Sequence, residues 1–343
     1  MTFADEMKTA VTPRAALLVV GTLVLQLLFI ASYVGALHNP RPKDVPFGVV
    51  APAQVAPQLV SRLGAIPGRP LDPRTVSSAA EARRKMLNRD LDGVLIVSPT
   101  GTKDTLLVAS GGGTVLSSAL DRLVTEVEKT QRRTVRTVDV APASAQDFDG
   151  LSAFYLVVGW CVGGYLCASI LAISAGSRAA NRTRAALRLM SMALYSVLGG
   201  LGGAVIVGPV LGALPGSVLG LWGLGALVVF GVGAITLALQ ALTGIVGIGL
   251  AVLLIVIAGN PSAGGAFPLP MLPPFWHAIG PWLPPGAGTW VARSLAYFKG
   301  NSVTGPLLVL SGWAVAGTVI TLALSVFRRR TPTVPEAREA PRA

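Results

Sequence analysis

Long apolar runs without charged side chains alternate with one long polar region along this chain. The first run, residues 15–37, is uncharged. At about 1.5 Å of rise per residue, a helix of this length exceeds the roughly 30 Å hydrocarbon core of a bilayer. A cleaved signal peptide, with small residues near Gly35 and Ala36 at the cleavage site, is the competing interpretation. Because the apolar run is longer than in a usual signal peptide, the pattern favours a transmembrane helix that follows a short N-terminal segment, residues 1–14.

Five more apolar segments follow the polar region and are predicted to cross the membrane. They are residues 154–175, 189–211, 218–239, 245–257 and 306–327. Glycine is dense in the middle of this set. Its simplest role there is to let helices approach closely, and the alternative is a hinge. The pattern predicts an α-helical integral membrane protein with six transmembrane helices, the last five forming a membrane domain over residues 151–327.

The polar region, residues 38–150, has the alternation of a small α/β domain inserted between helices 1 and 2. Helical periodicity and short β-branched runs follow one another along it. We expect strands at 47–50, 92–97, 104–109 and 134–140, and helices at 53–63, 77–88 and 115–131. Asp72-Pro73 and the segment from Pro99 to Gly101 are typical of turns. A domain of about 110 residues can bury a core of its own.

Residues 260–299, which we call the collar, are crowded with Pro, Gly and Trp between the last two spans. Pro273 and Pro274 suit the first turn of a short helix. Gly280-Pro281, and then Pro284 and Pro285, are expected to end it. The side chains that fall roughly on one face of this helix are Phe275, Trp276, Ile279 and Trp282. Indole rings settle at membrane interfaces, so the pattern predicts an interfacial or re-entrant segment rather than an irregular outer loop.

Charge adds an orientation to this picture. Only 13% of residues are charged, against about 25% in soluble domains. The net charge is +12, but residues 38–150 contribute only +3, whereas the segments 1–14, 176–188 and 328–343 together contribute +7. This positive-inside bias predicts that both termini are cytoplasmic, with a disordered tail at 328–343, and that the α/β domain is extracytoplasmic. It also argues against nucleic-acid binding, which needs a continuous basic surface.

Candidate chemistry is sparse. Asp90, Asp92 and Asp104 have no histidine beside them, and the Gly111–Gly113 run lacks the Lys-Ser/Thr of a phosphate-binding loop, so we interpret the run as a turn. Cys161 and Cys167 form neither a disulfide framework nor a metal pattern and are expected to be packing residues. We therefore expect no enzyme activity, no catalytic residues, no metal and no cofactor.

The membrane spans lack the groups that couple transport to ions. No Asp or Glu occurs between Asp149 and Glu336, and no Lys or Arg between Arg188 and Arg293. Proton-driven carriers retain charged residues inside the membrane, and intramembrane proteases need acids or histidines there. Both classes are therefore disfavoured, and a transported substrate would need energy from another protein.

The collar resembles the segment before the last span of type-2 ABC transporter permeases, most closely the phage-infection-protein-like branch. The similar residues run from Asn260-Pro-Ser-Ala to Pro268, from Leu272-Pro-Pro-Phe-Trp to Ile279, and over Leu283-Pro284. The resemblance implies a permease without its own ATPase that forms a homo- or heterodimer and binds a separate cytoplasmic ATPase subunit. It places the docking surface on residues 1–14 and 176–188, with the charged members Arg178, Arg182, Arg184 and Arg188. Alternatively, these arginines only set the topology.

Together these features predict the membrane permease subunit of an ATP-driven exporter. An uncharged bundle rich in Gly and Leu favours an amphipathic or lipidic substrate over an ion. The alternative is a non-transporting envelope or surface protein whose extracytoplasmic domain binds a partner or supports secretion or cell-wall assembly. The preference for Arg over Lys, with abundant Ala and Gly, fits a GC-rich bacterial genome and a plasma-membrane location.

Overall fold

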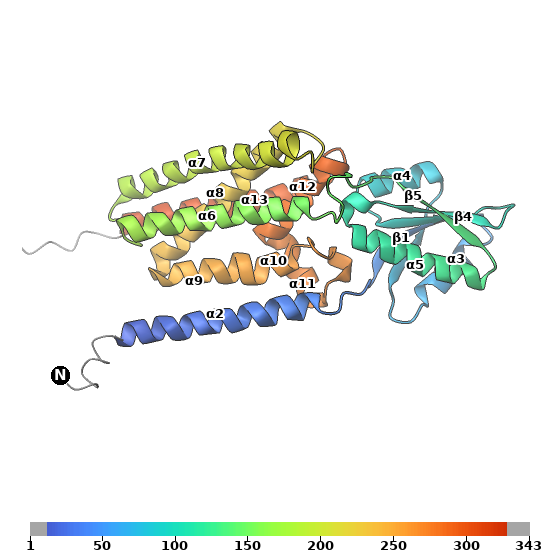
Figure 1. Cartoon of the computed structure of the whole chain (residues 1–343), viewed down its shortest axis with the longest axis horizontal. Coiled ribbons are helices and arrows are strands. Elements are labelled where there is room, and N and C mark those ends of the chain that lie inside the picture. The colour runs from blue at the N-terminus through green and yellow to red at the C-terminus, as the bar shows by residue number, and fades with distance from the viewer. Residues whose placement is uncertain (1–11, 328–343) are drawn as a thin grey trace, which may run out of the picture.

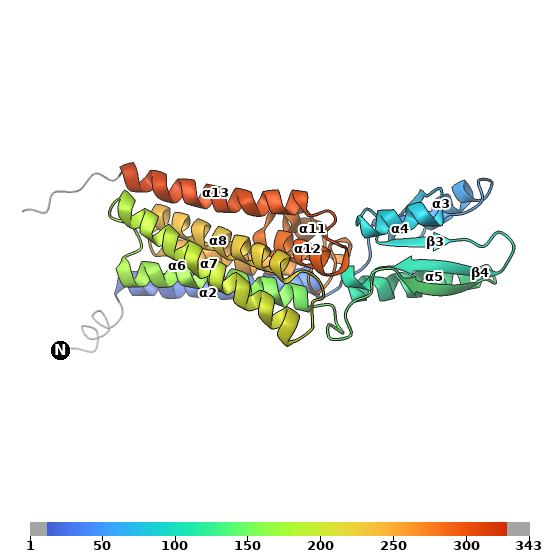
Figure 2. The same cartoon turned by 90° about the horizontal axis from the view of Figure 1, so that it is seen from above.

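The computed structural model describes residues 12–327, which form a bundle of long helices with a small α/β domain beyond one of its ends (Figures 1 and 2). Within this range, five helices are long and apolar enough to cross a membrane, which makes the chain a helical, multi-pass membrane protein. The predictions for most of the N-terminal segment and for the 328–343 tail lie outside the described residues.

Three of the five long helices start at a residue whose side chain caps the first turn. Thr12 accepts a hydrogen bond from the Ala15 amide, and Asn181 accepts one from the Arg184 amide at 2.9 Å. Ser217 caps the most buried of these helices. The helices are α2 (Pro13–Leu37), α6 (Ser152–Ala175), α7 (Arg182–Val205), α8 (Val218–Thr243) and α13 (Thr304–Phe327).

The fifth predicted span, residues 245–257, is a shorter apolar helix than the others. It runs over Val246–Ser262 and is composed of α9 (Val246–Val252), the π-helical η3 (Leu253–Gly259) and α10 (Asn260–Ser262). Seventeen residues reach about 25 Å, less than the roughly 30 Å of a hydrocarbon core. Five of the six predicted crossings thus have a helix of the expected length. The crossing by residues 245–257 stays a prediction.

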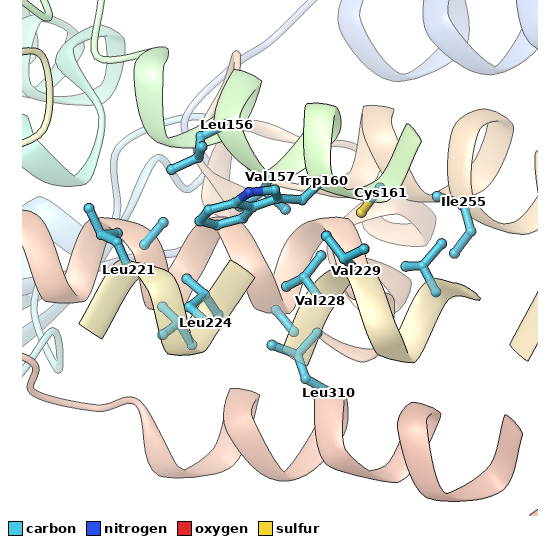
Figure 3. Close-up of a cluster of buried hydrophobic side chains, with 14 of the residues drawn as sticks. Leu156, Val157, Trp160, Cys161, Leu221, Leu224, Val228, Val229, Ile255 and Leu310 are labelled. Atoms are coloured by element: carbon cyan, nitrogen blue, oxygen red, sulfur yellow. The ribbon is translucent and has the colours of Figure 1, made fainter. Parts of the chain in front are cut away.

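Helix α8 packs against α6, α7 and α13, and Trp160 of α6 lies in the resulting core (Figure 3). Its indole Nε1 donates to the Gly199 carbonyl at 3.2 Å. A Cβ on Gly200 would lie 2.5 Å from the Ala226 amide, and one on Gly225 would lie 2.5 Å from the Trp160 ring. The packing role predicted for the glycines is confirmed at these two positions. Both cysteines are free, and Cys161 is buried in the same core.

Helix α2 lies at the edge of the bundle and exposes most of its surface (Figure 1). The Ser32 hydroxyl donates to the Ile257 carbonyl, which joins α2 to η3. Leu17 is 72% exposed and Val34 57% exposed. In a membrane-spanning helix, apolar side chains exposed in this way are in contact with the lipid of the bilayer.

The α/β domain is a five-stranded sheet in the order β2-β1-β3-β4-β5, with helices on both faces. Only β3 and β4 pair antiparallel. Side chains of α3 and α5 pack with Phe47, Leu95 and Leu106 on one face, and those of α4 pack with Val94 and Leu107 on the other. The strands are β1 (Val45–Val50), β2 (Leu71–Thr75), β3 (Gly93–Ile96), β4 (Lys103–Val108) and β5 (Thr134–Asp139), and the helices are α3 (Ala56–Gly64), α4 (Ala79–Leu87) and α5 (Thr114–Thr130).

The four expected strands and three expected helices of this domain are confirmed within a few residues at each end. The interpretation of Asp72-Pro73 as a turn is wrong, because both residues belong to β2, which pairs with β1. A proline is tolerated there because β2 is an edge strand, which has an unpaired side.

Candidate functional site

The collar contains a buried helix that the sequence pattern did not predict. Helix α12 (Pro284–Tyr297) packs against α6, α8 and α13. Pro284 and Pro285 open this helix, so the prediction that they close one is wrong. The preceding Leu283 is extended, and proline is well suited to a first helical turn. Small residues let α12 enter the bundle: a Cβ on Gly288 would lie 2.7 Å from Val157 of α6.

The predicted short aromatic helix is present as α11 (Pro274–Ile279), followed by the 3-10 turn η5 (Gly280–Trp282). Phe275 is 62% exposed and Trp282 is 69% exposed, whereas Trp276 and Ile279 are half-buried. The rings of Phe275 and Trp276 meet edge to face with centroids 5.0 Å apart. Of these two exposed rings, that of Trp282 belongs to a residue whose carbonyl accepts from the Trp313 indole, nearer the middle of α13, at 2.8 Å. Their position in a membrane interface stays a prediction.

The α6–α7 connection lies at the end of the bundle opposite the α/β domain (Figure 1), and the four arginines in it and in the first turns of α7 do not form one surface. Arg178, Arg182 and Arg184 are exposed, but Arg188 is buried. Its Nη2 donates to the Ala175 and Gly176 carbonyls at 2.7 Å each, which caps the C-terminus of α6. Arg188 therefore has a structural role, and ATPase docking by the three exposed arginines stays a prediction.

Arg293 of α12 is a buried cation at the other end of the bundle and is only 4% exposed. Its Nη1 donates to the Gly264 carbonyl at 2.7 Å, and its Nη2 donates to the Gly265 and Gly150 carbonyls at 2.8 and 3.1 Å. Its Nε has no hydrogen-bond partner within residues 12–327. Neutral carbonyls thus surround the guanidinium. The charge of the buried Asp147 also acts on it, but no carboxylate of the described residues forms a close ion pair with it.

Arg89 brings a second cation to the same place from the α/β domain, in the turn between α4 and β3. Its Nη1 donates to the Trp290 carbonyl and to the Ser294 hydroxyl, both at 2.9 Å. Its guanidinium lies 3.4 Å from the centre of the Trp290 ring, a cation–π contact. Burial, and then the like charge of Arg293, lower the pKa of Arg89 to about 9.

These two arginines line a cavity of about 570 Å³ between the α/β domain, the collar and the start of α13. The volume is in the range of small-molecule sites. Asp92 supplies one acid to the wall, and burial raises its pKa to about 6. The rest of the wall is mainly apolar or polar without charge, and its members include Pro46, Pro268, Leu269, His277, Ala287, Thr289, Trp290 and Pro306.

The Gly111–Gly113 run is part of the contact between the α/β domain and helix α12 beside this cavity. It lies at the 3-10 helix η1 (Ser110–Gly112), which packs on α12, so the expected turn is a domain contact as well. A Cβ on Gly111 would lie 2.5 Å from the Tyr297 ring. On the other side of the junction, the Ser302 hydroxyl donates to the Asn88 carbonyl. The walls of the cavity are thus held together by direct contacts.

No protein-family model, curated protein or solved structure matches the chain in the comparisons made. The resemblance to type-2 ABC permeases therefore stays a prediction. What the site can bind therefore has to be inferred from its own residues.

The sequence signals only part of this site. Arg293 is the single charged residue between Arg188 and Lys299, and a lone charge in an apolar region is a functional signal. Arg89 carries no such signal, since its partners lie about 200 positions away along the chain. Of the three aspartates singled out from the sequence, Asp92 lines the cavity, while Asp104 pairs with Arg133 elsewhere in the domain. No group of acids, histidines and cysteines in the described range could hold a metal ion.

Proposed function

We propose that the chain is the membrane permease subunit of an ATP-driven exporter, with a separate ATPase acting at the end of the bundle opposite the α/β domain. The observation that carries the proposal is the cavity built jointly by the α/β domain, α12 and the start of α13. Because its walls belong to separate elements, a small movement of the domain against the helices would change the volume of the cavity and the access to it.

A continuous packed route joins the two ends of the bundle. The exposed Arg182 begins α7, and α7 packs along α6 and α8. Helix α6 in turn contacts α12, where Val157 faces Gly288. A force applied at the α6–α7 connection can therefore reach α12 through rigid helices, which is what a permease driven by an external ATPase requires.

Co-purification tests the ATPase part of this proposal. We expect the full chain, purified from its native membrane, to retain an ATPase, and the variant Arg182→Glu/Arg184→Glu to lose most of it. The matched control Arg132→Glu/Arg136→Glu makes the same charge change at exposed positions of the α/β domain and should retain the ATPase. Equal retention by the two variants, or no ATPase with the unaltered chain, would contradict the proposal.

A distance measurement tests the movement. Spin labels at Arg84 on α4 and Val315 on α13 both lie on exposed positions, on opposite sides of the domain junction. We expect the distribution of distances between them to shift when ATP is added to the complex that retains its ATPase. A distribution unchanged by ATP would show that the domain and the bundle move as one body.

Partner binding without transport is a second candidate, favoured by strand β5. It is an edge strand and is exposed at Thr134, Arg136 and Thr137. Exposed edges can accept an extended peptide by strand addition. This candidate expects Arg136→Pro to abolish partner binding and Arg182→Glu/Arg184→Glu to be harmless, the opposite of the exporter proposal.

A further inference from the structure

The cavity lies at the depth at which a membrane-spanning helix begins. Thr304, Gly305 and Pro306, in the first turn of α13, form part of its wall. Leu308 is already 68% exposed, as expected of a side chain that faces lipid. The exposed Trp282 lies beside the same helix through its bond to Trp313. A bilayer around the bundle would therefore place its headgroup layer near the level of the cavity.

Among the described residues, neither arginine of the wall forms a close ion pair, although the charge of Asp92 acts on Arg89 and that of Asp147 acts on Arg293. Arg89 and Arg293 make hydrogen bonds to carbonyls and one hydroxyl, and neither forms an ion pair within residues 12–327. The one carboxylate in the wall, Asp92, has no hydrogen bond from either arginine in this range. A buried cation is stable when an anion or several hydrogen bonds satisfy it, and the Nε of Arg293 is left unsatisfied.

The remaining wall suits an apolar group. Pro268, Leu269 and Pro270 lie on the collar side, and Pro306 lies on the side of α13. The Trp290 ring also lines the cavity and has the Arg89 guanidinium on its face. A wall with a few convergent cations and a large apolar share is typical of sites for amphipathic molecules.

We propose that this cavity binds an amphiphile with an anionic headgroup, such as a phosphodiester lipid, with the headgroup held by Arg89 and Arg293 and the apolar part along the prolines toward α13. The proposal names a ligand class for the cavity of the proposed permease, but it concerns binding, which does not require that the ligand be exported. Arginine suits this role because its planar fork matches phosphate oxygens.

Binding is measured with the purified full chain in nanodiscs of zwitterionic lipid. The probes are a fluorescent phospholipid with a phosphoglycerol headgroup and its phosphocholine counterpart with the same acyl chains. We expect the phosphoglycerol probe to bind saturably and about tenfold or more tightly than the phosphocholine probe. Equal binding of both probes would overturn the proposal. So would displacement by micromolar inorganic phosphate, because the ligand would then be a free anion. No ATPase is present, so the result is independent of the exporter tests.

Asp92→Asn is the decisive variant because it should improve binding. The side chain makes no hydrogen bond in the described range, so the substitution removes charge with little structural effect. Without this nearby negative charge, we expect the phosphoglycerol probe to bind severalfold more tightly and the phosphocholine probe to bind unchanged. Loosening of the fold would weaken both probes instead. Unchanged selectivity between the headgroups would contradict a role of the arginines in holding the anion.

A bulky substitution in the cavity wall tests whether the apolar part of the ligand binds there. Gly305 lines the cavity, and a Cβ there meets no atom within 4 Å, so Gly305→Phe is compatible with the fold. We expect a loss of phosphoglycerol-probe binding of about tenfold. Gly312→Phe is the matched control, because Gly312 lies on the same helix with equally open space but outside the cavity wall. Equal binding by the two variants would place the probe elsewhere on the protein.

Discussion

Two places in the α/β domain hold an arginine against buried groups, and their electrostatics differ. The guanidinium of Arg133 forms a bidentate ion pair with the Asp104 carboxylate, at 2.6 Å from Nε to Oδ2 and 2.5 Å from Nη2 to Oδ1. Arg89, at the junction with the membrane helices, meets a carbonyl, a hydroxyl and an aromatic face. Arg293 repeats this pattern opposite it, with carbonyls alone.

The charge of Arg133 is paired within the folded domain, whereas the charges of Arg89 and Arg293 are available to a ligand. At Arg133 the countercharge is built into the domain, and the Ser98 amide also donates to Asp104, at 2.8 Å. At Arg89 and Arg293 the domain and the bundle supply dipoles but no carboxylate in ion-pair contact. An anion from outside the chain could form the missing ion pair at Arg89 and Arg293, whereas Arg133 already has its pair within the domain.

The largest expected effect comes from breaking the complete pair. Asp104→Asn removes the closer of the two carboxylates that pair with Arg133 and leaves Glu128, whose Oε2 lies 3.7 Å from the Arg133 Nε. Removal of one partner of a buried pair destabilises by up to about 3 kcal/mol. Hydrogen exchange of the full chain should show faster exchange in β4 and β5. The control Asp90→Asn, at an exposed position, should change exchange little. Equal protection in both variants would mean that the pair does not stabilise the domain.

A smaller effect is expected from Arg89, since its partners are neutral. Arg89→Ala removes two hydrogen bonds from a charged donor and the contact with Trp290, which together stabilise by about 2 kcal/mol. The loss should be confined to the junction, with faster exchange in α12 while β4 and β5 keep their protection. Arg84→Ala, on the exposed side of α4, is the control. Loss of protection throughout the α/β domain would make Arg89 part of the domain core.

A third effect is a pH dependence beside the complete pair. Burial, and then the hydrogen bond to Asp104, raise the pKa of Glu128 to about 7. The folded domain therefore holds this proton more tightly than the unfolded chain, whose glutamate has its usual value of 4.5. The stabilisation is complete below pH 4.5 and is lost as the pH rises through 7. Glu128→Gln should abolish the decline in β5 protection between pH 5 and 8, and an unaltered decline would assign it to another group.

The sequence predicts the membrane class and the α/β domain well, because apolar runs and strand alternation are local patterns. It does not predict α12. Pro284 and Pro285 disrupt a helix in most positions, and only the extended Leu283 before them makes them a helix start. It also misses β2, where the edge position tolerates Pro73.

The site was predicted less well than the fold. The spacing of the aromatic residues predicts the short helix α11, and Phe275 of α11 and Trp282 of η5 are both exposed. The cavity, by contrast, depends on a contact between Arg89 and α12, two segments about 200 positions apart. Arg293 stands out in the sequence as an isolated charge among apolar residues, and Asp92 as one of few candidate carboxylates.

In our account, Arg89 and Arg293 of the cavity hold the headgroup of an anionic amphiphile. Native mass spectrometry of the full chain, released from membranes in a mild detergent, tests it most directly. We predict one anionic lipid retained by the unaltered chain, retained equally by Gly312→Phe and lost by Gly305→Phe. Retention of zwitterionic lipid only, or the same anionic lipid on both variants, would contradict the claim.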